Sequence, residues 1–177
     1  MARRGSRAGG AGKPRAGKLV RKAVEALDKP RVRGPNPDLP PVTIKIQRKP
    51  FMPKGPFQRK TNALKKLGEE GKLYKATNPV ARNDKITSDY RQDLIKRIHE
   101  QYGRRNPEFS RRLIDRVTDP TRMHPDHVWE LQLGGPDHAS NLRFLHARTN
   151  TDIGTRQIWP QIQNLTDGTP IRIEVIE

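Results

Sequence analysis

Residues 124–159 read HPDHVWELQLGGPDHASNLRFLHARTNTDIGTRQIW. Two short apolar runs, at 128–133 and 142–145, stand on either side of the segment GGPD at 134–137. Glycine, proline and aspartate in succession favour a turn. From about Ala147 onward the sequence permits a helix. We therefore expect a strand, a loop, a second strand and a helix along this stretch.

Four polar residues recur through the stretch at fixed spacing. Asp126 adjoins His127, Asn141 follows His127 by fourteen residues, and Asn150 follows Asn141 by nine. This order and spacing, together with the glycine pair after the first run and Asn-Leu-Arg at the entry to the second, resembles the HNH nuclease module, also called ββα-metal. The resemblance covers about a fifth of the chain.

The resemblance implies a role for each of these residues. Asp126 and Asn150 would be metal ligands, His127 the general base, and Asn141 the residue that ties the intervening loop and orients His127. Cleavage of a phosphodiester bond would leave a 5′-phosphate and a 3′-hydroxyl. A branch of the family carries a further histidine four residues after the last motif position, where this chain has Gly154. We therefore expect an oxygen-rich site for one divalent ion, Mg²⁺ or Mn²⁺.

Several basic residues near the motif are candidates to bind phosphate. Arg148 is the first choice for holding the scissile phosphate, because it lies beside Asn150 at the start of the expected helix. Further candidate phosphate or DNA contacts are His124, His146, Arg143 and Arg156.

Each motif residue also has a structural interpretation. Asp126 could cap a turn, His127 could be a structural histidine, and Asn150 could cap a helix. We expect Glu130 to form a salt bridge beneath the site and Trp129 to belong to the core.

Charge points to a polyanionic partner. The chain of 177 residues has 36 Lys and Arg against 19 Asp and Glu, a net charge of +17. Nucleic acid is the first expectation for such a chain and an anionic membrane the second. The absence of cysteine excludes disulfides and thiolate zinc sites. We expect no secretory signal, because no apolar segment follows the first residues, and no membrane span.

The rest of the chain divides near residue 77. We expect a basic Gly/Pro-rich leader and linker at 1–77, disordered or serving as an adaptor, and the nuclease domain at 78–177. Within the first part we expect a weak helix at 18–27, a strand around Val42, Ile44 and Ile46, and a helix at 60–67, with prolines 50, 53 and 56 breaking any regular element between them. In the second part we expect helices at 89–102, with Ser88 as its N-cap, and from Pro107 after an Asn106 cap, and a strand at 171–176 on the edge of the small sheet.

These expectations combine into an α+β fold with a ββα-metal core, preceded by helices and a basic leader. The function we expect is metal-dependent, largely non-specific DNA cleavage. The motif behind a basic leader also resembles antibacterial nuclease toxins. That implies an acidic immunity protein, and a secretion-machine component that binds the leader and exports the protein from the bacterial cytoplasm into a target cell. Alternatives are a phage or mobile-element endonuclease and, in a different class, a non-enzymatic basic nucleic-acid-binding protein.

Overall fold

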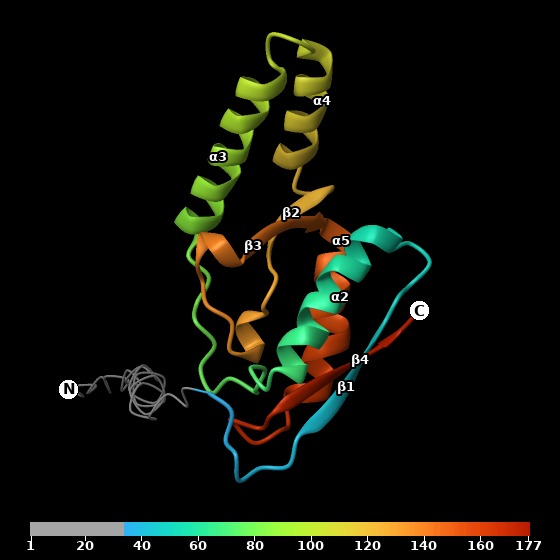
Figure 1. The fold of residues 1–177 in the computed structure, drawn as a ribbon, viewed down its shortest axis with the longest axis vertical. Helices are drawn as coiled ribbons and strands as arrows, with labels where there is room; N and C mark the ends of the chain where they lie inside the picture. Colours follow the sequence, from blue (N-terminus) through green and yellow to red (C-terminus); the bar gives the residue numbers. More distant parts are fainter. Residues whose placement is uncertain (1–33) are drawn as a thin grey trace, which may run out of the picture. The chain divides into compact units, whose positions relative to one another are not determined.

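The computed structural model describes residues 34–177, which belong to one compact unit. The basic leader up to residue 33, with the helix expected at 18–27, lies outside the described residues. The described chain combines helices with two small two-stranded sheets, so the α+β fold class is confirmed (Figure 1). Within residues 34–177, no helix combines the length and the apolar character that crossing a membrane requires.

The first sheet joins two segments that lie far apart in the sequence. Strand β1 (Val42–Gln47) pairs in parallel with β4 (Ile171–Ile176), with Val42 opposite Ile171. Alternate residues of both strands are buried, including Ile44, Ile46 and Ile173. Period-two alternation of this kind predicts a strand with one buried face, and both strands are confirmed. We expected the C-terminal strand at the edge of the small sheet formed by the motif. That position is wrong, because β4 pairs with β1 and not with the hairpin that carries the motif.

Helix α2 (Lys54–Glu69) packs against this sheet and is longer than the helix expected at 60–67. Pro56 lies in its first turn, where a helix does not need the missing N–H, so this proline does not break the element. Phe57 and Leu64 are fully buried with Ile44 and Ile46 in the same core. The segment at 42–69 is therefore part of the folded unit and not a linker or adaptor. The residues on both sides of the boundary expected at 77 belong to the same compact unit.

Two helices precede the motif and pack against each other (Figure 1). Helix α3 (Asp84–Tyr102) begins five residues earlier than expected, because Asn83 and not Ser88 is its N-cap; the Asn83 side chain accepts from the N–H of Lys85. Helix α4 (Pro107–Thr118) begins as expected, with Asn106 capping the N–H of Phe109. The ring of Tyr90 stacks on Phe144 at 5.6 Å, which ties α3 to the motif.

The motif forms an antiparallel hairpin, but its first strand lies earlier than expected. Strand β2 (Met123–His127) pairs with β3 (Leu142–His146), so the second expected strand is confirmed. The strand expected at 128–133 is wrong, because that segment is a loop ending in the short 3-10 turn η1 (Leu131–Leu133). Gly134 follows with φ at +86°, and a β-carbon there would meet the Tyr74 ring. Only glycine adopts this conformation without strain, so Gly134 suits the position that ends η1.

Helix α5 (Ala147–Thr151) begins directly after β3, as expected. It runs on through a π-helical segment, η3 (Asp152–Ile158), into α6 (Trp159–Ile162). Ile153, Ile158 and Ile162 bury one side of this helix in the core. The first turn of this helix, α5, contacts both strands of the hairpin, and this contact sets the geometry of the site.

Candidate active site

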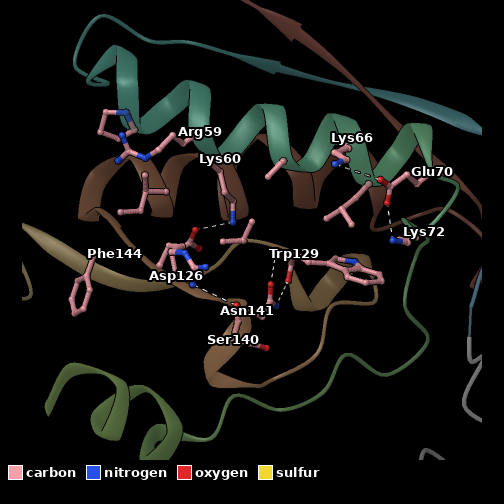
Figure 2. A pocket seen from close by; sticks show the side chains of 16 residues that line it. Arg59, Lys60, Lys66, Glu70, Lys72, Asp126, Trp129, Ser140, Asn141 and Phe144 are labelled. Atoms are coloured by element: carbon pink, nitrogen blue, oxygen red, sulfur yellow. Dashed lines mark hydrogen bonds and ion pairs between the residues drawn. The ribbon is translucent and has the colours of Figure 1, made fainter. Parts of the chain in front are cut away.

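Two hollows flank the hairpin. The first, which we call the α2 cavity, has a volume of about 820 Å³ and lies between α2 and the hairpin; Lys60, Asp126 and Asn141 are among its lining residues (Figure 2). The second, the helix cleft, has a volume of about 380 Å³ and lies along the helix that begins at α5. The helix cleft is lined by Arg82, His124, Glu130, Gln132, Asn150, Thr151, Gly154, Thr155 and Trp159.

His127 forms a buried pair with an aspartate. Its Nε2 lies 2.7 Å from Asp137 Oδ1, and the two side chains are only 2% and 3% exposed. Burial alone would raise the pKa of Asp137, but hydrogen bonds from the Asn83 N–H, at 2.5 Å, and from His127 outweigh it and hold that pKa below its ordinary value. Asp137 is therefore an ionised acceptor, and Nε2 of His127 carries the hydrogen.

The second ring nitrogen of His127 faces an arginine. Arg82 Nη2 lies 3.4 Å from His127 Nδ1, and Arg82 also lines the helix cleft. Because Nε2 donates to Asp137, Nδ1 has its lone pair available as an acceptor. The acceptor nitrogen of His127 is therefore covered by the guanidinium of Arg82, and Arg82 lines the helix cleft.

Asp126 points away from His127, as neighbours on a strand do. Its Oδ2 lies 2.8 Å from Lys60 Nζ, and the two side chains are 4% and 2% exposed. Lys60 reaches down from α2, as Figure 2 shows, and also donates to the main-chain carbonyl of His127. Its Nζ lies 2.8 Å from Glu130 Oε1, so the salt bridge expected at Glu130 is confirmed.

Burial and the neighbouring charges shift the pKa values of Asp126 and Lys60. Burial raises the pKa of Asp126 to about 6, although the Lys60 ammonium opposes that shift. Burial alone would lower the pKa of Lys60, but Glu130 and Asp126 outweigh it and raise that pKa. Lys60 is therefore a permanent buried cation, and Asp126 is its counter-ion.

Asn141 ties the loop between the strands. Its side chain accepts from the N–H of Trp129 at 2.9 Å and donates to the carbonyls of Trp129 and Pro136, each at 2.9 Å. These bonds take the main-chain groups that a longer strand would have paired, which explains why β2 ends at His127. Asn141 therefore holds the loop that carries Asp137, and its side chain bonds to Trp129 and Pro136 rather than to His127 itself.

Asn150 meets a different partner from the one expected. Its Nδ2 lies 3.5 Å from His124 Nδ1, and both residues line the helix cleft. Asp126 lines the α2 cavity instead. The two expected metal ligands, Asp126 and Asn150, therefore line different hollows.

This separation decides how a divalent ion would fit. The pair predicted from the motif does not fit, because Asp126 is committed to Lys60 on the other face of β2. Within residues 34–177, no three His, Cys, Asp or Glu side chains converge as a metal cluster. The cleft does combine the Asn150 amide oxygen, the His124 imidazole and Glu130, whose Oε1 already lies 2.8 Å from Lys60 Nζ. Oxygen donors with one nitrogen suit Mg²⁺ or Mn²⁺.

The remaining candidate phosphate contacts lie outside the helix cleft. Arg148 stacks over the Phe51 ring at 3.9 Å, and Arg143 lines the α2 cavity and donates to the Leu142 carbonyl. Arg156 lies 3.8 Å from Asp152 on the outer side of the helix. His146 Nδ1 lies 2.9 Å from Thr149 Oγ1. Of the basic candidates named from the sequence, the cleft contains His124 alone.

Reasoning from the motif missed Asp137, Arg82 and Lys60. Asp137 stood inside the predicted turn, where aspartate has an ordinary structural explanation. Arg82 and Lys60 precede His127 by 45 and 67 residues, and no local pattern links them to it. For Lys60 a weak signal existed, since a lysine on the buried face of an amphipathic helix needs a counter-charge.

Comparison with known proteins adds no assignment. No family model, no curated protein and no solved structure matches this chain.

Proposed function

We propose that this chain is a metal-dependent endonuclease of the HNH class that hydrolyses DNA phosphodiester bonds without sequence preference. The observation that carries the proposal is the buried His127–Asp137 pair, whose second imidazole nitrogen contacts Arg82 of the helix cleft. The order β2, β3, α5 around it supports a ββα-metal core. The net charge of +17 supports a polyanionic substrate, bound largely through its phosphates.

In this mechanism His127 is the general base. Nδ1 accepts a proton from the attacking water, because Nε2 is held as a donor to Asp137. The positive charge that forms on the imidazole is stabilised by the Asp137 carboxylate, as in other Asp–His pairs. Asn141 keeps this geometry by fixing the loop between the strands.

Arg82 is the phosphate-binding residue of the mechanism. A guanidinium binds two phosphate oxygens at once and does so more strongly than it binds a neutral imidazole. Substrate phosphate in the cleft would draw Arg82 from His127 Nδ1 and open that nitrogen to water. Arg82 thus takes the role first expected of Arg148.

A divalent ion, Mg²⁺ or Mn²⁺, belongs to the proposal. Asn150 and His124 would hold it, with Glu130 contributing the carboxylate oxygen that is not paired with Lys60, and Asp126 would remain the counter-ion of Lys60 and not a ligand. When bound, such an ion neutralises charge on the phosphate and the leaving oxygen. Every proton transfer above is made by the chain's own residues.

The biological role we propose is an antibacterial toxin. It would be made in a bacterial cytoplasm, exported by a specialised secretion system that recognises the leader, and neutralised by an acidic immunity protein. The charge of +17 supports an acidic partner. A neighbouring gene for a small acidic protein would support this role, whereas packaging or intron genes would support a phage or mobile-element endonuclease.

The function is tested by nicking of supercoiled plasmid with Mg²⁺, Mn²⁺ or EDTA. We compare the wild type with His127→Ala, and with His138→Ala as the matched control, because His138 is an exposed loop histidine. Cleavage that needs the metal, fails in His127→Ala and persists in His138→Ala supports the proposal. Equal cleavage by His127→Ala would overturn the mechanism. DNA binding without cleavage of DNA or RNA by any protein would favour the non-enzymatic binding protein.

A further inference from the structure

Trp159 is an exposed aromatic residue on the helix cleft. It is 41% exposed, whereas most large apolar side chains of the described chain pack in the core. Its neighbours in the cleft include the phosphate-binding Arg82 and Asn150. The other tryptophan, Trp129, packs against the core, and its Nε1 donates to the Leu133 carbonyl. Only Trp159 of the two therefore presents its ring at the cleft.

The helix aligns Trp159 with two threonines, the first of which adjoins Asn150. Thr151, Thr155 and Trp159 recur every four residues on one continuous helix, and all three line the cleft. Residues at this spacing lie on one side of a helix. They form a strip from Asn150 outward: an amide, two hydroxyls and an indole. π-Helical segments such as η3 occur frequently at functional sites.

The Trp159 ring also has a cation over it. Lys75 Nζ lies 5.6 Å from the ring centroid and 3.5 Å from Asp167. The Lys75 side chain is only 11% exposed, so it is held in place. A cation at an aromatic ring favours a fixed ring position. A ring that is supported and still exposed is ready to accept a flat ligand.

The combined chemistry of the cleft matches a nucleotide. A guanidinium and the Thr155 hydroxyl suit a phosphate, whereas the Thr151 hydroxyl already donates to the Ala147 carbonyl. An exposed indole suits a base. The cleft volume of about 380 Å³ lies within the ordinary range of small-ligand sites. A base inside a duplex is already stacked on both faces, so only an unpaired or unstacked base could meet Trp159.

We propose that Trp159 stacks an unpaired nucleobase beside the phosphate held by Arg82, so that the site prefers single-stranded nucleic acid over duplex. This inference rests on the proposed nuclease function and adds a substrate class to it. Stacking on an aromatic residue tolerates any base, which agrees with cleavage that has no sequence preference.

The test uses Trp159 as its own probe. In His127→Ala with Trp129→Phe, Trp159 is the one tryptophan left, because the chain has two. The probes are a single-stranded oligonucleotide, the same strand with abasic sites, and its duplex. We expect strong quenching by the intact strand and weak quenching by the other two. Where Trp129→Phe unfolds the chain, 5-fluorotryptophan labelling and ¹⁹F NMR resolve the two indoles in His127→Ala.

Affinity supplies a second readout. Trp159→Ala should weaken binding of the intact strand about 5- to 150-fold, the range that loss of one stacked base predicts. Trp159→Phe should retain most of the affinity. Tyr102→Ala is the matched control, since Tyr102 is 36% exposed at the end of α3 and does not line the cleft. Equal binding by Trp159→Ala, or equal quenching by the abasic strand, would overturn the inference.

The outcomes separate this inference from the nuclease proposal. Stacking without cleavage of any nucleic acid would leave the inference standing and refute the nuclease. Cleavage that depends on His127, with binding that does not depend on Trp159, would support the nuclease and refute the inference.

Discussion

His127 Nε2 and Asp137 Oδ1 lie 2.7 Å apart, and almost nothing of either side chain is exposed. Nine residues of loop separate the two in the sequence, and Asn141 holds that loop in place. The pair determines which imidazole nitrogen is basic and which direction that nitrogen faces. It therefore links the geometry of the hairpin to the proposed chemistry.

Asp137→Asn should lower kcat by roughly 10²- to 10⁴-fold, the usual contribution of a well-oriented acid or base. An amide can donate to Nε2, which favours the wrong imidazole tautomer and leaves no charge to stabilise the imidazolium. Single-turnover cleavage measures the effect, and Asp115→Asn on the exposed face of α4 is the control. Wild-type kcat in Asp137→Asn would show that the pair is only structural.

Lys60→Met should lower the free energy of unfolding by about 3–5 kcal/mol, because it leaves Asp126 and Glu130 buried without their counter-ion. Lys66→Met, on the same helix with a side chain 77% exposed, should change it by less than about 1 kcal/mol. Urea unfolding measures both.

Combining Lys60→Met with Asp126→Asn should recover part of the loss, since one buried charge is removed. If the double variant is less stable than Lys60→Met, charge neutralisation is not what holds Lys60, Asp126 and Glu130 together.

The pH dependence of stability should carry the signature of Asp126. Its pKa rises from the ordinary 3.8 to about 6 on folding, so the native state binds the extra proton between those values. Its contribution to stability is present below about pH 4 and is lost as pH rises through about 6.

Asp126→Asn removes this titration. The difference in unfolding free energy, wild type minus Asp126→Asn, should therefore fall across that window by up to about 1.4 kcal/mol per pH unit. Denaturant unfolding at several pH values measures it. A difference that stays constant or rises from pH 4 to 6 contradicts the raised pKa.

Asn141→Ala should cost about 2–4 kcal/mol of stability and also disturb the site, because three main-chain groups lose their partners. Asn141→Asp keeps the acceptor for the Trp129 N–H but cannot donate, so its stability should lie between those of the wild type and Asn141→Ala. Thermal unfolding gives the order, and hydrogen exchange at the 128–137 loop locates the change. Unchanged exchange there in Asn141→Ala would show that the loop does not depend on this side chain.

Local sequence rules predicted the elements whose signals are local. The strand at β3, the turn after residue 133, the Asn106 cap and the alternation in β1 and β4 follow from side-chain period and turn chemistry. The rules failed at 128–133, where apolar residues resembled a strand. There Asn141, twelve residues beyond Trp129, takes the main-chain hydrogen bonds of Trp129, and no propensity encodes that contact.

By itself, the sequence determined the α+β class, the order of the motif elements and the spacing that brings His127, Asn141 and Asn150 into one hairpin and helix. Only the tertiary structure decided their partners: Asp126 joins Lys60, His127 joins Asp137 and Arg82, and Asn150 joins His124. The physical reason is the distance along the chain over which each kind of interaction acts. Periodicity and capping act within a few residues, whereas a buried charge is neutralised by whichever opposite charge packing brings within about 3 Å, regardless of its position along the chain.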